Sequence, residues 1–282
     1  MKSNATQFEI NTLGTRRYFK WIVYGLLLIN FGFYVRYDWM IAGHTLNSSS
    51  TILDWTRAYA VTIDESAWMI LLILFELETR FINNSLSPIK ALIMRAVRIG
   101  CYVSIAHTLY AYAVYVEELS RPQLIEGVSD LCELVGDGAS YTYNLIYTTL
   151  STENCAELSG AEDFFYIDPP TFSIVQDASG LAIERELAWI DLAEAITWLL
   201  ILFTIELVVL LQDHKVADGI LFRTINGSKF ILYSLLWCAI GYWIFRGHYM
   251  FAWDELVWIV GFIVIEVNMV ERHKNIFSMR TI

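Results

Sequence analysis

Residues 187–211 read LAWIDLAEAITWLLILFTIELVVLL, an apolar run long enough to cross a lipid bilayer as a single helix. The carboxylate of Glu206 stands in the most apolar part of this run. A charged side chain at such a depth costs about 2.5–3.5 kcal/mol on insertion scales, so it must face the protein interior, find a partner or stay protonated. The run therefore predicts a membrane helix that carries an ionisable site.

The same run contains a spacing that recurs twice elsewhere in the chain. An acid is followed four positions later by Trp and twelve positions later by Glu, in the copies Asp64–Trp68–Glu76, Glu194–Trp198–Glu206 and Asp254–Trp258–Glu266. An apolar segment with its own pattern precedes each copy. The three versions of that pattern are Lys20–Tyr24–Leu27–Phe31–Tyr34, Arg98–Tyr102–Ile105–Leu109–Tyr112 and Lys229–Tyr233–Leu236–Ile240–Trp243. Successive helical residues are about 100° apart, so the five residues of each version lie on one face of their helix. Because each such segment is followed by a copy of the acid–Trp–Glu spacing, we predict three pseudo-repeated helix hairpins.

Composition supports this prediction. The chain has 282 residues, of which 56% are hydrophobic, and this is typical of a protein that crosses the membrane several times. The six expected spans are 18–41, 62–83, 89–116, 187–211, 227–247 and 252–272. The predicted fold class is therefore an all-α polytopic membrane protein with six transmembrane helices and a small mixed extracytoplasmic insert.

The repeats divide the chain into five parts. These are repeat unit 1 (1–86), the first helix of repeat unit 2 (87–116), the insert (117–186), the second helix of repeat unit 2 (187–214), and repeat unit 3 with the tail (215–282). With the six expected spans, 14 of the 19 Lys and Arg residues lie on the same side of the membrane. Because basic residues favour the cytoplasmic side, both termini are expected in the cytoplasm, at a bacterial inner membrane or a plasma membrane.

The insert carries the charge imbalance of the whole chain. Residues 117–186 hold 14 acids and 2 bases, which argues against nucleic acid as a partner. Such a surface attracts cations or a basic protein partner, and a homo-oligomer is also possible there; the alternative is a solvated acidic loop. Cys132 and Cys155 are expected to form a disulfide, and the runs 141–149 and 171–175 predict two or three short strands.

The repeated bases and glutamates reach a similar depth in the membrane. This predicts the ion pairs Lys20–Glu76, Arg98–Glu206 and Lys229–Glu266, with Tyr24, Tyr102 and Tyr233 available to donate hydrogen bonds to the carboxylates. Two interpretations fit these pairs. In one, the three glutamates bind or relay a proton or cation. In the other, the pairs are structural cross-links between hairpins.

Further polar residues have the same two kinds of interpretation. His107 lies within the third span, either as a proton relay or as a packing histidine. The outer acids Asp64, Glu194 and Asp254, together with Glu65, Asp191 and Glu255, either cap helices or form an acidic ring that concentrates cations. The sequence contains no ligand-spaced motif for a metal and none for a cofactor.

The leading functional hypothesis is a transport protein for protons or a small cation. The alternative is a non-catalytic scaffold or accessory subunit that docks a partner through residues 117–186. A membrane enzyme ranks third, since the sequence supplies no nucleophile–base set.

Overall fold

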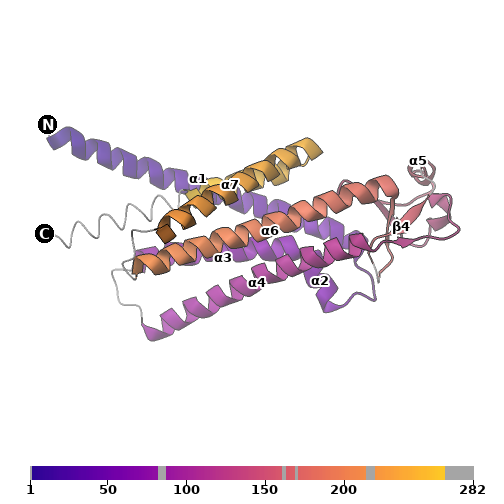
Figure 1. Ribbon diagram of the computed structural model, residues 1–282, viewed down its shortest axis with the longest axis horizontal. Helices are drawn as coiled ribbons and strands as arrows, with labels where there is room; N and C mark the ends of the chain where they lie inside the picture. The colour runs from indigo at the N-terminus through magenta and orange to yellow at the C-terminus, as the bar shows by residue number, and fades with distance from the viewer. Residues whose placement is uncertain (1, 82–86, 161–162, 169–170, 214–219, 264–282) are drawn as a thin grey trace. The chain divides into compact units, whose positions relative to one another are not determined.

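The structure is a computed structural model that describes residues 2–81, 87–160, 163–168, 171–213 and 220–263 (Figure 1). It is mostly helical, with one small sheet. The helices are α1 (Lys2–Thr45), α2 (Ile52–Ala58), α3 (Ala60–Phe81), α4 (Pro88–Ser120), the 3-10 helix η1 (Leu131–Leu134), α5 (Cys155–Leu158), α6 (Ala178–Asp213) and α7 (Ile220–Arg246). Residues 249–263 are also helical. The strands are β1 (Gln123–Leu124), β2 (Ser140–Tyr143), β3 (Ile146–Thr149), β4 (Phe164–Tyr166) and β5 (Ile174–Asp177).

Three helices are long and apolar enough to cross a membrane, namely Tyr18–Thr45, Ala178–Val208 and Arg223–Arg246. A fourth candidate is the pair Ile52–Ala58 and Ala60–Leu77, which is bent by 68° at its break. The chain is therefore a membrane protein by the length and composition of its helices. The expected segment 89–116 is helical but is not among these candidates, and 252–272 continues past the described residues.

The bend between α2 and α3 has a local cause. Thr51 caps α2, and its side chain and that of Asp54 each accept a hydrogen bond from the backbone of the other. At the other end, Tyr59 leaves the helical conformation with φ −108° and ψ 24°. The Asp38 carboxylate of α1 then accepts a hydrogen bond from Thr62 N at 2.8 Å, which satisfies an otherwise free N–H near the start of α3.

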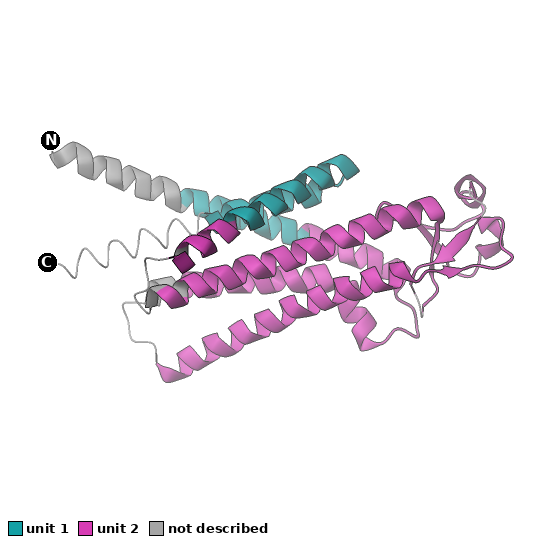
Figure 2. Cartoon of the chain, in the orientation of Figure 1, with its two compact units in different colours: residues 1–32, 230–282 teal, residues 33–229 magenta. Residues whose placement is uncertain are grey.

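The chain divides into two compact units, coloured separately in Figure 2. Unit 1 contains residues 1–32 and 230–282, and unit 2 contains residues 33–229. Within unit 2, α4 packs against both α3 and α6, and α6 packs against β2 and β5. The small sheet therefore lies at the end of the unit 2 helices where α4 ends and α6 begins (Figure 1).

The insert forms a five-stranded sheet in the order β1-β4-β5-β2-β3. The pair β2–β5 is parallel and the others are antiparallel, so the sheet is mixed, as expected. The expected number of strands, two or three, was too low. The added strands β1 and β4 have 2 and 3 residues, which is too short for an alternating pattern to be visible in the sequence.

The two faces of this sheet have different neighbours. Alternate strand residues point to opposite faces. One face packs with η1 and α5 in a cluster that includes Tyr141, Phe164 and Val175. Ile174, on the other face, packs against Leu119 of α4 and its neighbours on α6. The insert thus has a core of its own and also rests on the membrane helices.

Two features hold the insert in shape. Cys132 and Cys155 lie at disulfide distance with an S–S separation of 1.92 Å, which joins η1 to α5. Asn144 and Leu145 connect β2 to β3 with φ values of 52° and 59°. A two-residue hairpin turn of this kind needs two positive φ values, and Leu adopts them less readily than Gly.

Candidate functional site

The Tyr102 hydroxyl of α4 donates a hydrogen bond to Glu206 Oε1 of α6 at 2.6 Å. Tyr102 belongs to the repeated pattern that begins with Lys or Arg, and Glu206 belongs to the pattern that begins with an acid. Glu206 is exposed on the surface of the protein, and Tyr102 is partly exposed. In a bilayer, a carboxylate at such a place needs this kind of donor, because lipid offers none.

The repeated acid–Trp spacing has a physical basis in the first copy. The indole N–H of Trp68 donates a hydrogen bond to Asp64 Oδ2 at 3.1 Å, one helical turn away. The ring of Trp68 also meets that of Trp198, the Trp of the second copy, at a centroid distance of 6.0 Å and an angle of 60°. Corresponding residues of two predicted repeats therefore lie in direct contact within unit 2.

The pattern that opens with a base faces protein in all three helices. None of its fifteen members is exposed, although several of the neighbouring residues on the same helices are. On α1, for example, Leu27 is buried while Leu28 and Ile29 are exposed. This burial agrees with a shared helix face, the geometry from which the pattern was inferred.

Four acids from three helices interact electrostatically with the Tyr112 side chain of α4. Asp38 of α1, Asp64 of α3, and Asp191 and Glu194 of α6 all lie within electrostatic range of it. We call Tyr112 with these acids the acidic tyrosine cluster. It brings together Asp64 and Glu194 of the expected outer ring; Asp254, the third member, belongs to unit 1.

The positions of Asp64, Asp191 and Glu194 exclude helix capping as their role. The helix α6 begins at Ala178, so Asp191 and Glu194 lie well inside it. Neither α3 nor α6 has an acid in its first turn. The favourable interaction with a helix N-terminus falls off within that turn. The capping interpretation of Asp64, Asp191 and Glu194 was therefore wrong.

Asp191 stands out within the acidic tyrosine cluster. No residue of the described parts forms a hydrogen bond or an ion pair with its carboxylate, which lies near Tyr37, Glu184 and Tyr112. Asp38, in contrast, is buried and accepts the hydrogen bond from Thr62 N. A partly buried carboxylate without a base beside it is stabilised when it takes up a proton or a cation.

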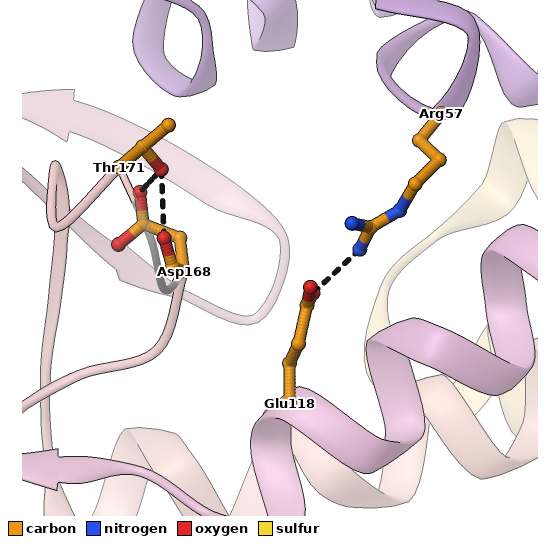
Figure 3. A network of polar contacts seen from close by, with 4 residues as sticks. All are labelled: Arg57, Glu118, Asp168 and Thr171. Atoms are coloured by element: carbon orange, nitrogen blue, oxygen red, sulfur yellow. Dashed lines mark hydrogen bonds and ion pairs between the residues drawn. The ribbon is translucent and has the colours of Figure 1, made fainter. Parts of the chain in front are cut away.

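A second charged group lies at the ends of α2 and α4 (Figure 3). Arg57 Nη2 pairs with Glu118 Oε2 at 2.6 Å, and both side chains are mostly buried. Burial raises the pKa of Glu118 above its ordinary value, and the pair with Arg57 opposes that rise. Figure 3 also shows Asp168, whose carboxylate accepts a hydrogen bond from the Thr171 hydroxyl at 2.5 Å.

Unit 1 has a buried polar pair of its own. Asn30 Nδ2 of α1 donates a hydrogen bond to Asp254 Oδ1 at 2.7 Å. Both residues are buried, and the helical segment 249–263 supplies Asp254. The Lys20 ammonium lies 5.8 Å from the ring centroid of Tyr24, within cation–π range.

The remaining expected site residues have these positions. Lys20 belongs to unit 1 and Glu76 to unit 2, and Glu266 lies outside the described residues. The pairs Lys20–Glu76, Arg98–Glu206 and Lys229–Glu266 stay predictions. Tyr233 is partly buried on α7. His107 Nε2 is buried without a hydrogen-bond partner among the described residues, and its ring lies 6.1 Å from that of Tyr110.

One group of three His, Cys, Asp or Glu side chains close enough to share a metal ion occurs in the described chain, formed by Asp130, Cys132 and Cys155. The two sulfurs are joined to each other, so they are not available as thiolates. Asp130 Oδ1 accepts hydrogen bonds from Cys132 N and the Ser159 hydroxyl. This set is therefore structural.

Sequence reasoning gave no role to Asp38 and Glu184, and for Asp191 it left helix capping and an acidic ring as alternatives. Asp38 follows an apolar run and has no motif around it. Glu184 falls in the acidic insert, where it is one of 14 acids. The one available signal was the spacing of seven residues between Glu184 and Asp191, which places both on one helix face. No protein-family model, curated protein or solved structure matches this chain.

Proposed function

We propose that this chain is an integral membrane protein that moves protons or a small cation across the bilayer. The observation that carries the proposal is the partly buried Asp191 carboxylate, which interacts electrostatically with Tyr37, Glu184 and Tyr112 and has no hydrogen-bond or ion-pair partner in the described structure. An ionisable group inside a membrane helix is a candidate site for an ion or a proton. Tyr112 and its four neighbouring acids would form the outer part of the path.

The inner part of the proposed path runs along α6 to Glu206. Asp191 and Glu206 are fifteen residues apart on this helix, which corresponds to about 22 Å. The hydrogen bond from Tyr102 holds the Glu206 carboxylate toward α4. The proposed counter-charges remain Lys20, Arg98 and Lys229, paired with Glu76, Glu206 and Glu266.

We also propose the six-span, three-repeat architecture with both termini in the cytoplasm. The six expected spans are helical over their described residues except Gly247, which follows the end of α7, and the repeated pattern on α1, α4 and α7 is turned toward protein. The Asp64–Trp68 hydrogen bond supports one role for the repeated spacing. The domain boundaries 86/87, 116/117, 186/187 and 214/215 belong to this proposal.

The direct test is flux across liposomes that contain the purified protein. Proton and monovalent-cation flux would be measured for the wild type, Glu206→Gln and Asp191→Asn, which remove a charge and preserve size. Glu126→Gln, an exposed acid of the insert, is the matched control. We expect wild-type flux above that of empty liposomes. The flux should fall about tenfold or more in both test variants and stay unchanged in the control.

A non-catalytic scaffold is the second candidate. One observation favours it: the insert is a folded domain whose edge strand β3 leaves Ile146 64% exposed. Exposed edge strands are common docking sites for other chains. No flux from well-folded wild-type protein would overturn transport. Crosslinking from a photoreactive residue at position 146 would then identify the partner.

A further inference from the structure

The helix-facing side of the small sheet carries polar side chains that the proposed path does not use. Thr142 of β2 stands opposite Tyr147 of β3. In the parallel pairing of β2 with β5, Tyr141 stands beside Val175, so the next residues along the two strands, Thr142 and Gln176, also lie side by side. Three neighbouring strands thus present a row of polar side chains on one face.

This row faces the membrane helices. Ile174, two positions before Gln176 and on the same face, packs with residues of α4 and α6. Tyr115 of α4 and Glu184 of α6 both lie close to Tyr147. We call Tyr115, Thr142, Tyr147, Gln176 and Glu184 the polar layer.

The polar layer contains several buried atoms whose hydrogen-bonding capacity is unused. Thr142, Gln176 and Glu184 have no exposed surface at all. Among the described residues, Gln176 Oε1 and Nε2 and Glu184 Oε2 have no hydrogen-bond partner, and the hydroxyls of Thr142 and Tyr115 lie beside Tyr147. Each buried atom without a partner costs about 1–3 kcal/mol, and native proteins usually satisfy them with ordered water or an ion.

Glu184 gives the polar layer a negative charge. Its Oε1 accepts a hydrogen bond from Leu145 N at 2.8 Å, which stabilises the strained hairpin turn. That structural role leaves Oε2 unused. No basic side chain of the described residues pairs with Glu184, and Asp191 adds a second negative charge within electrostatic range.

We propose that the polar layer binds a hard divalent cation of the calcium class. Glu184 Oε2 is the charged ligand, the amide oxygen of Gln176 and the Thr142 hydroxyl are neutral ligands, and water completes the shell. Oxygen-only donor sets select calcium-like ions over zinc or copper, and calcium tolerates an irregular shell better than magnesium does. Asp191 balances the second positive charge. The acidic insert raises the local concentration of such ions.

The site shares Asp191 with the proposed path but does not require transport, so its test uses no flux. The full-length protein in detergent, stripped with a chelator, would be titrated with CaCl2 while its melting temperature is followed by tryptophan fluorescence. A saturable rise of about 5 °C is expected for the wild type, because a ligand that binds only the folded state stabilises it. An equal concentration of MgCl2, at matched ionic strength, should give a smaller rise.

Three variants assign the effect to the polar layer. Glu184→Gln keeps an acceptor for Leu145 N and removes the charge, and Asp191→Asn alters a carboxylate with no partner in the described structure. Both should lose most of the calcium response, whereas Glu157→Gln, an exposed acid of the insert, should keep it. If Glu184→Gln fails to fold, Asp191→Asn decides. A wild type that responds equally to calcium and magnesium, or test variants that respond like the wild type, would overturn the site.

Discussion

Arg57 and Glu118 are 61 residues apart in the chain, yet Nη2 of the first lies 2.6 Å from Oε2 of the second. Arg57 belongs to the short helix α2 before the 68° bend, and Glu118 to the last turn of α4. Their side chains are 20% and 16% exposed, so water screens the pair only in part. The pair therefore fixes the bend to the helix beside it.

Breaking this pair should destabilise the protein. Arg57→Ala leaves the Glu118 carboxylate half-buried without its partner and is expected to cost about 1–3 kcal/mol in the free energy of unfolding. Arg121→Ala removes the Arg121–Glu117 pair, whose side chains are 79% and 57% exposed, and should cost about 0.5 kcal/mol or less. Chemical unfolding of both variants and of Glu118→Gln measures the difference. Equal costs for the two arginines would show that α2 is not held by Arg57.

Asp177 should make the insert sensitive to acid. Its carboxylate accepts hydrogen bonds from Gly180 N and the Ser179 hydroxyl at 2.7 Å and from the Tyr141 hydroxyl at 2.9 Å. Burial raises the pKa of Asp177, but the hydrogen bonds outweigh burial and hold the pKa below its ordinary value of 3.8. A group with a lowered folded pKa stabilises the fold above its unfolded pKa, and the stabilisation is lost as pH falls through the folded value.

The corresponding variant is Asp177→Asn. It is expected to lower stability by about 1 kcal/mol at neutral pH and to flatten the fall in melting temperature below about pH 4. Asp163→Asn, an exposed acid of the same insert, should follow the wild-type curve. Melting curves recorded from pH 7 to pH 3 test this. If the melting temperature of Asp177→Asn falls with pH as steeply as that of the wild type, Asp177 is not the source of the acid sensitivity.

Asp168 organises the loop before β5. Its carboxylate accepts hydrogen bonds from Ser173 N and Ile174 N as well as from the hydroxyls of Thr171 and Ser173. Phe172, within this loop, has a φ of 50°, which costs energy for a non-glycine residue. Asp168→Ala should therefore cost about 2–4 kcal/mol and expose the loop to protease, because several hydrogen bonds to one charge are lost together. Asp137→Ala, an exposed acid in a turn, serves as the control; equal proteolysis rates would contradict the prediction.

The disulfide should matter mainly to the insert. Cys132 and Cys155 are separated by 23 residues, and closing a loop of this length contributes about 3 kcal/mol in the chain-entropy view. Replacing both by Ser should lower the stability of the insert and leave the helices folded, as judged by circular dichroism. Cys238→Ser, which alters an exposed free cysteine on α7, should have little effect. Loss of the whole fold in the double variant would show that the insert is needed by the membrane helices.

Part of this structure could be predicted from the sequence, and the rest depends on packing. The repeated pattern located the helix faces that turn toward protein, because periodicity on one helix is a local property. The convergence of Asp38 and Asp191 on Tyr112 requires three helices to pack in one arrangement, and no spacing along the chain encodes that distance. The start of α6 at Ala178 was missed for a related reason: its first turns are polar, so the apolar run predicted a later start.

Tyr102 provides the final prediction, since its hydroxyl bonds directly to Glu206 at 2.6 Å. Tyr102→Phe removes this donor and keeps the ring, so the protein should fold while flux in liposomes falls about tenfold. Tyr110→Phe removes a hydroxyl from an exposed residue of the same helix and should leave flux unchanged. If Tyr102→Phe has normal flux while Glu206→Gln has lost it, the carboxylate works without this donor. Normal flux in both would exclude Glu206 from the path and leave the hydrogen bond as a link between α4 and α6.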